Sequence, residues 1–300
     1  MTTLLRFFKI QDLAITPMHY LFKLPLHVAR ASVLLGIFAS PALAQTIDIV
    51  ETGGSTAYQW DAITGEITAG ENIAINAAEL IDKLDTQNVT VRADQINVSA
   101  DIVSNTASRL TLKTTNSIDV DANQTIETNG GDIVFWTNPT ASNSASGHIR
   151  LNSGVILSTA AGSTASDLSG NGNILLAGGK DLNNDELPDG FAKTTSTYGI
   201  RLASGVAMYS GGGDIGVRGE TYSTGTNRQG VRQEEDLIIN AGTGTILIEG
   251  KNRDGRGSWP LTMGVGTVNN LSLISASSSA KAITLKGTGG RNGIDLGGSS

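Results

Sequence analysis

The sequence contains no cysteine and few aromatic side chains. Among its 300 residues, 5% are Phe, Trp or Tyr and 16% are charged. Without thiols, the chain can form neither disulfides nor thiolate metal sites, and it has no Cys nucleophile. The scarcity of aromatic rings argues against a thick globular core built on them. Instead the chain has 37 glycines and 39% hydrophobic residues, a mixture that suits a thin aliphatic core.

Basic residues and histidines are also scarce. The chain has 21 Lys and Arg against 28 Asp and Glu, a net charge of −7, and three histidines. Because affinity for a phosphate backbone comes from Lys and Arg, no nucleic-acid partner is expected. Only His148 lies beyond residue 44. A zinc site or a His-assisted nucleophile that needs paired imidazoles is therefore disfavoured.

The first 44 residues have the layout of a secretory signal peptide. Basic residues from Arg6 to Arg30 precede an apolar run over 31–39 and the small residues 42–44, so cleavage is predicted after Ala44. The apolar run has 9 residues, and a bilayer-spanning helix needs about 20, so no transmembrane helix is predicted in the mature chain. A chain that starts at Met18 would have a signal peptide of more ordinary length than one that starts at Met1. The alternative to a cleaved signal peptide is an N-terminal amphipathic helix that remains in the mature protein.

Short apolar-polar-apolar triplets dominate the rest of the chain. This period of two is typical of half-buried strands. Three interleaved series share a period of about 22 residues, and their triplets begin at Val89, Leu110 and Ile133, at Ile96 and Ile118, and at Ile102 and Ile126. The prediction is an all-β fold, a right-handed parallel β-helix (β-solenoid) with three strands per turn. An antiparallel sandwich is the alternative, but it would not keep three series at one period.

The same order of triplets is predicted to continue with longer connections. First strands begin at Ile133, Ile174 and Ile215, 41 residues apart each time. The segments HIRLNSGVILST (148–159) and GIRLASGVAMYS (199–210) are near copies, and they contain the second and third strands of two turns. In the turn after Ile215, the triplets predict the second strand at Leu237 and the third at Ile246.

Most of the additional length is predicted to leave one corner of the coil, between first and second strands. These excursions are 136–148, 177–199 and 218–236, whereas 158–173 and 249–270 are assigned to another corner. Loops displayed by a rigid scaffold are where binding usually occurs. The stacked excursions are therefore the predicted display surface.

One short helix is predicted over 76–86. Ala77, Leu80, Ile81 and Leu84 share one face at helical spacing, and this face is expected to pack on an early turn. The predicted organisation is a signal peptide (1–44), N-terminal irregular turns with a short helix cap (45–87), and a parallel β-helix with stacked loop excursions (88–300).

The passage NVTVRADQINVSADIV (88–103), followed by SRLTLKTTNSIDVDANQTIETNGGDIVFW (108–136), resembles the repeat region of the filamentous haemagglutinin-like family of secreted bacterial β-helix adhesins. The likeness covers roughly 60–296. It implies a right-handed parallel β-helix, an extracellular or cell-surface location on a Gram-negative bacterium, and export by outer-membrane machinery. The implied partner is a host or bacterial surface glycan or protein receptor.

Two features depart from that family. The Asn-Pro-Asn motifs of its secretion domain are absent, and only Asn138-Pro139 comes near them. The last residues, RNGIDLGGSS, resemble neither the closing strand of an outer-membrane barrel nor a polar cap. The expectation is a chain truncated at its C-terminus, with an export route that the sequence does not specify.

The sharpest local motif is DLNNDELPDG (181–190). Asp181, Asn183, Asp185 and Asp189 supply oxygens at positions 1, 3, 5 and 9, the spacing of a Ca²⁺-binding loop. The motif is also similar to the calcium loops of thrombospondin type 3 repeats. Glu186 occupies the usual Gly position, and no Glu stands at position 12. A solvated Asx-rich turn is therefore the alternative to a Ca²⁺ site.

A second candidate site is the segment EGKNRDGRGSW (249–259). It gathers Lys251, Arg253, Arg256 and Trp259 in an otherwise acidic chain. The prediction is a sugar- or anion-binding spot in which Trp259 stacks on the ligand and the basic groups donate hydrogen bonds. The alternative is a solvated loop whose Trp packs back on the coil.

The alternative function is a polysaccharide lyase or hydrolase, which would need paired carboxylates, or a carboxylate with a Lys or Arg base. Asp119 and Asp121 are predicted to point outward, and Asp132 and Asp214 open their strands. Nothing brings an acid and a base together, so these residues are expected to cap turns. No catalytic residue is predicted and the chain is not expected to be an enzyme. A passive surface-layer or biofilm scaffold is the third hypothesis.

Overall fold

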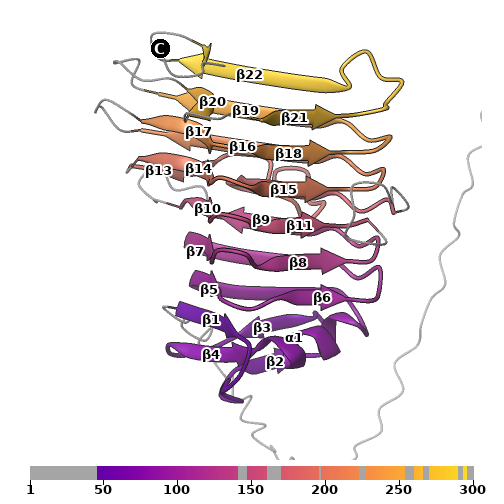
Figure 1. Cartoon of the computed structure of the whole chain (residues 1–300). Helices are drawn as coiled ribbons and strands as arrows, with labels where there is room; N and C mark the ends of the chain where they lie inside the picture. Colours follow the sequence, from indigo (N-terminus) through magenta and orange to yellow (C-terminus); the bar gives the residue numbers. More distant parts are fainter. Residues whose placement is uncertain are drawn as a thin grey trace, which may run out of the picture. The chain divides into compact units, whose positions relative to one another are not determined.

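The computed structural model describes residues 46–140, 147–160, 170–195, 197–222, 228–253, 260–265, 270–289 and 293–295. The predicted signal peptide lies outside these residues. The described part is all-β apart from one helix, and every strand pairing in it is parallel except one. Figure 1 shows the strands from β5 to β22 stacked in chain order, and β1 in indigo lies between β4 and β5. This arrangement is compatible with a β-helix or solenoid.

The parallel pairings form three ladders. The first ladder runs through β3 (Glu66–Thr68), β5 (Val89–Val98), β7 (Leu110–Val120), β9 (Ile133–Thr137), β12 (Ile174–Gly178), β16 (Ile215–Thr221), β19 (Ile246–Asn252) and β22 (Ile283–Gly289). A short strand, β13 (Ala192–Thr194), also pairs with the far end of β16.

The second ladder shares the long strands β5 and β7 with the first. It runs through β4 (Ile73–Asn76), β1 (Thr46–Val50), β5, β7, β10 (Ile149–Leu151), β14 (Tyr198–Leu202), β17 (Gln229–Glu234), β20 (Leu261–Val265) and β23 (Ile294–Asp295). The register between β5 and β7 shifts between Ala93 and Gln95, which divides each strand between the two ladders.

The third ladder is a separate sheet. It contains β6 (Ile102–Ser104), β8 (Thr125–Thr128), β11 (Ile156–Ser158), β15 (Val206–Tyr209), β18 (Leu237–Asn240) and β21 (Leu271–Ile274). The remaining strand, β2 (Gln59–Asp61), pairs with β3 in the one antiparallel hairpin.

The period predicted from the triplets is confirmed by the register of the ladders. Val89 pairs with Leu110, Ile96 with Ile118, and Ile102 with Ile126. Inward aliphatic side chains of successive strands stack into one continuous buried core. Full burial of each aliphatic side chain contributes about 1.5–3 kcal/mol, so the core needs few aromatic rings.

The strand assignment in the turn after Ile215 was wrong. Leu237 pairs with Val206 in the third ladder, and Ile246 pairs with Ile215 in the first. The second-ladder strand of this turn is β17, whose Val231 pairs with Ile200. β17 has the sequence QGVRQE, in which Gln229 and Gln233 are buried on either side of Val231 and Gln233 is in register with Leu202. The period of two is therefore hidden.

The wrong strand assignment also put one loop excursion at the wrong corner of the coil. The segment after β19 leads from the first ladder to β20 in the second ladder. The excursion predicted over 249–270 thus leaves the same corner as 136–148 and 177–199, and the prediction of another corner was wrong. This corner carries the long connections of four successive turns.

Stacked backbones approach closely where the chain turns from the third ladder to the first. A Cβ on Gly131, Gly172 or Gly213 would collide with a carbonyl oxygen of the preceding turn. Next to each glycine, a hydroxyl donates to the glycine carbonyl, as Thr159 does to Gly172 at 2.6 Å. Glycine is required here because the backbones leave no room for a side chain.

The predicted helix is present as α1 (Ala77–Leu84). The Asn76 side chain caps it by accepting from the Ala78 N–H at 2.8 Å. Ala77, Leu80 and Leu84 are buried, and the helix contacts β4 and β6. In the described part of the chain, no helix is long and apolar enough to cross a membrane.

Candidate functional site

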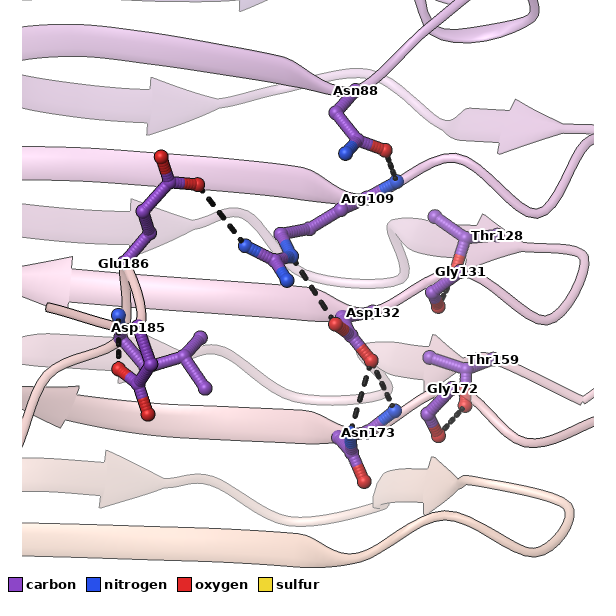
Figure 2. Close-up of polar contacts among 11 residues, drawn as sticks. Asn88, Arg109, Thr128, Gly131, Asp132, Thr159, Gly172, Asn173, Asp185 and Glu186 are labelled. Atoms are coloured by element: carbon purple, nitrogen blue, oxygen red, sulfur yellow. Dashed lines mark hydrogen bonds and ion pairs between the residues drawn. The ribbon is translucent and has the colours of Figure 1, made fainter.

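A column of polar side chains lies where the first-ladder strands begin (Figure 2). Asn88 Oδ1 accepts from the Arg109 N–H at 2.8 Å, and Asp132 Oδ1 accepts from the Asn173 N–H at 2.8 Å. Asn173 Oδ1 in turn accepts from the Asp214 N–H at 2.8 Å. Asp214 Oδ1 accepts from the Thr245 N–H at 2.7 Å. Each side chain satisfies a backbone donor one turn later, so the turn-capping role predicted for Asp132 and Asp214 is confirmed.

The loop 181–190 is folded by its own acidic side chains. The Asp181 carboxylate accepts from the N–H groups of Asn184 at 2.6 Å and Glu186 at 3.0 Å. Asp185 accepts from the Leu187 N–H at 3.0 Å. Asn184 and Glu186 have positive φ angles of 62° and 65°. Glu186 therefore adopts the strained backbone that a glycine usually takes at this position.

The four predicted calcium ligands lie in this one exposed loop. Asp189 Oδ2 accepts from the Leu182 N–H at 2.7 Å, and Asn183 Nδ2 donates to Asp185 Oδ2 at 3.0 Å. Within the described ranges, no three His, Asp or Glu side chains are placed to bind a metal. The geometry shows an Asx-rich turn, and Ca²⁺ binding stays a prediction.

The loop 181–190 also reaches back to an earlier turn. Figure 2 shows the Glu186 side chain pointing toward Arg109, which directly precedes β7, with 3.7 Å between the carboxylate and Nη1. Arg109 Nε also donates to Asp132 Oδ2 at 3.1 Å. The loop thus lies beside the outer face of the first ladder.

A groove of about 310 Å³ is enclosed between this loop and the first ladder, and we call it the loop groove. Its size is at the lower end of the range for small-molecule sites. Its lining residues are mostly polar: Thr64, Glu66, Asn88, Thr90, Arg92, Arg109, Thr111, Lys113, Trp136, Asp181 and Glu186.

Three of these residues stack in register on successive strands. Arg92 of β5 pairs with Lys113 of β7, and Lys113 pairs with Trp136 of β9. Lys113 Nζ lies 3.7 Å from the centroid of the Trp136 ring, a favourable cation–π contact. The Trp136 indole N–H donates to the Gly179 carbonyl at 2.7 Å, and the ring is 4% exposed. The ring therefore supports Lys113 and is not open for stacking on a ligand.

The electrostatics of the loop groove centre on Lys113. Burial from water, and then the neighbouring Arg92 guanidinium, lower the pKa of Lys113. Glu66, Asp181 and Glu186 act in the opposite direction but do not outweigh these causes. Lys113 has no ion-pair partner among the described residues, whereas Arg92 lies 3.4 Å from Glu66.

The basic residues of the later first-ladder strands, from β13 to β22, are paired with acids. In the first ladder, Glu220 lies in register between Lys193 and Lys251, with Nζ–Oε distances of 3.9 and 3.7 Å. Arg218 and Glu249 form a similar pair at 3.7 Å. Lys251, predicted to bind a ligand, is thus part of an alternating charge pattern.

The second predicted site is only partly described. Arg253 Nη1 donates to the Tyr222 hydroxyl at 2.8 Å, and its guanidinium lies 5.0 Å from that ring. Arg256 and Trp259 lie outside the described residues. Lys251 Nζ lies 5.4 Å from the centroid of the Phe191 ring. Both described basic groups thus lie over aromatic rings of this chain, and the predicted ligand spot stays a prediction.

Asp119 takes part in a small charge cluster on the second ladder. It lies 3.5 Å from His148 Nε2 and 3.7 Å from Arg150 Nη1. Burial raises the pKa of Asp119, but the hydrogen bond and charges of His148 and Arg150 outweigh it and leave the pKa lowered. An acid with a lowered pKa is a poor proton donor at neutral pH, which makes Asp119 unsuited to general-acid catalysis.

The loop groove was not predicted from the sequence. Arg92 and Lys113 are 21 residues apart, the same spacing as the Val89 and Leu110 triplets, so their stacking could have been read from the period. The position of Glu186 depends on the loop conformation, and no periodic signal predicts it.

No protein-family model, curated protein or solved structure matches this chain. The resemblance to filamentous haemagglutinin-like adhesins therefore stays an expectation from the sequence.

Proposed function

We propose that the chain is a secreted or cell-surface protein of a Gram-negative bacterium that displays binding loops on a right-handed β-helix with three strands per turn. The display serves attachment to a glycan or protein on another surface, as an adhesin or structural scaffold does. Three ladders of parallel pairs support this architecture, and parallel connections are right-handed in nearly all sheets.

The observation that carries the proposal is the loop 181–190. It leaves the coil between β12 and β13, is folded by the Asp181 carboxylate, and lies over the outer face of earlier strands. A loop pre-organised in this way loses less conformational entropy when it binds a partner.

Attachment can be measured with beads coated with the full chain and incubated with bacterial or host cells. Coated beads are expected to attach more than uncoated beads. The Asp181→Ala variant removes the acceptor that folds the loop and is expected to attach less. Asp82→Ala is the matched control, because Asp82 is exposed on α1 and has no hydrogen-bond or ion-pair partner in the described part. If beads with the unmodified chain attach no better than uncoated beads, the proposal is wrong.

The alternative function is a polysaccharide lyase or hydrolase. The observation in its favour is a lysine of lowered pKa in a groove that also contains Glu66 and Asp181, since a lysine base must lose its proton more readily than usual. Incubation with acidic polysaccharides and detection of new chain ends separates the two functions. Chain ends that appear with the unmodified protein and not with Lys113→Met would favour the enzyme.

A further inference from the structure

We propose that the loop groove binds a saccharide that carries one carboxylate, with the carboxylate between Arg92 and Lys113. This inference rests on the proposed function, because it names the ligand class of the displayed surface. Five observations support it: the stacking of two cations, an unpartnered donor, the balance of charge, the polar lining and the contrast with other columns.

The two cations are direct neighbours. Arg92 and Lys113 occupy paired positions on adjacent parallel strands, which lie about 4.8 Å apart. Like charges in directly opposed positions destabilise a sheet. An anion between them would relieve this repulsion and would restore to Lys113 some of the solvation that burial removes.

Arg92 also has an unused donor. Its Nε is buried and has no hydrogen-bond partner among the described residues, while its Nη1 lies 3.4 Å from Glu66. A carboxylate accepts two hydrogen bonds side by side from a guanidinium. The ligand carboxylate would therefore meet a donor on each side.

The charge of the whole groove selects against polyanions. Its lining contains three cations, Arg92, Arg109 and Lys113, and three carboxylates, from Glu66, Asp181 and Glu186. A nucleic acid or a heavily sulfated chain would bring several negative charges close to these acids. A ligand with one negative charge and many hydroxyl donors matches both the cations and the carboxylates.

The rest of the lining suits sugar hydroxyls. Thr64, Thr90 and Thr111 present hydroxyls, and Asn88 presents an amide. Because Asn88 Oδ1 is occupied by the Arg109 N–H, its Nδ2 remains as a donor. The groove thus offers donors and acceptors along its length.

Within the first ladder, the adjacency of cations is specific to this part. Farther along the same outward column, Arg218 pairs with Glu249, and Glu249 pairs with Lys286. Charges there alternate and neutralise one another. Cations also stack in the second ladder, where Arg150, Arg201 and Arg232 pair in register, but Asp119 and Glu234 neutralise them. Arg92 and Lys113 differ because Lys113 has no carboxylate partner in the described part of the chain, and a ligand carboxylate would supply one.

The test uses two disaccharides that differ only in the carboxylate, cellobiouronic acid and cellobiose, with the full chain and isothermal titration calorimetry. Cellobiouronic acid is expected to bind at least about tenfold more tightly than cellobiose, because cellobiose lacks the carboxylate that accepts a charged hydrogen bond. Lys113→Met keeps the aliphatic stem over Trp136 and is expected to weaken cellobiouronic acid binding about tenfold. Lys113→Arg retains the charge and should restore most of it.

Lys286→Met is the matched control, since Lys286 lies in the same column outside the groove. Equal binding of the two disaccharides, or equal weakening by Lys286→Met, would overturn the inference. Equal competition by inorganic sulfate would overturn the saccharide class, because it would show a site for any anion. If Lys113→Met fails to fold, the inference is still tested by the Lys113→Arg variant and by the difference in affinity between the two disaccharides.

The outcome is separable from that of the bead assay. Coated beads that attach to cells while cellobiouronic acid does not bind would leave the proposed function intact and remove this inference. Beads that do not attach while the disaccharide binds would remove the proposed function and leave the saccharide site intact.

Discussion

Asn173 links two acidic residues in the column that caps the first-ladder strands, and the substitution Asn173→Asp probes that link. Asn173 Nδ2 donates to Asp132 Oδ1 at 3.1 Å, and its Oδ1 accepts from the Asp214 N–H at 2.8 Å. The substitution keeps the acceptor and replaces the donor with a carboxylate oxygen. Three carboxylates would then follow one another along the column.

The expected cost has two parts. A hydrogen bond to a charged group contributes about 1.5–3 kcal/mol, and two charges about 4 Å apart near a surface repel by about 1–4 kcal/mol. Because Asn173 and Asp214 are exposed and Asp132 is only half-buried, the lower ends apply, and the sum is about 2 to 3 kcal/mol. For a domain of this size, this corresponds to a fall of about 4 to 12 °C in melting temperature.

Thermal unfolding followed by circular dichroism would measure the shift. Asn171→Asp is the matched control, because Asn171 is exposed and its side chain has no hydrogen-bond partner in the described part. A melting temperature for Asn173→Asp equal to that of the unmodified chain would refute the reasoning. The hydrogen bonds of the polar column would then result from the stacking of the strands and would not stabilise the fold.

Three further predictions follow from the core, the loop and the groove. Ile118 is fully buried between Ile96 and Ile149, so Ile118→Ala should cost about 2–5 kcal/mol in urea unfolding, and a loss below 1 kcal/mol would contradict a closely packed core. If the loop 181–190 binds Ca²⁺, millimolar Ca²⁺ should raise the melting temperature of the metal-stripped protein but not of Asp181→Asn, and no rise would leave only the Asx turn. The lowered pKa of Lys113 means that its charged form is disfavoured in the fold, so this cost is present at neutral pH and is lost as pH rises toward the ordinary value of 10.5. The unmodified chain should therefore gain stability relative to Lys113→Met as the pH rises from neutral toward 10.5, and the opposite slope would show that the Trp136 ring stabilises the ammonium more than burial destabilises it.

The sequence predicted the ladders where aliphatic residues repeat. Ile133, Ile174 and Ile215 stack as expected, because a parallel in-register core requires equivalent side chains one turn apart. The prediction failed at β17, where Gln229 and Gln233 are buried and conceal the strand. Hydrophobic periodicity cannot identify a strand whose inward positions are polar.

The candidate site was less predictable than the fold. The motif 181–190 was recognised as a folded loop, but its contact with Arg109 depends on tertiary structure. Arg92 and Lys113 were not singled out from the sequence, because a charged side chain taken alone says nothing of its neighbours. Their adjacency becomes informative only after the register is known.

The independence of coil and loops has a consequence for how such a chain can vary. Ile174 and Ile215 pair in the same way as Leu110 and Ile133, although 41 residues separate the first two and 23 the second two. Insertions at the loop corner thus leave the stacking unchanged. A lineage could lengthen, shorten or exchange a loop in a single genetic event and obtain a new binding surface on an unaltered scaffold. Substitutions at the stacked glycines would be eliminated, whereas the loops would diverge freely.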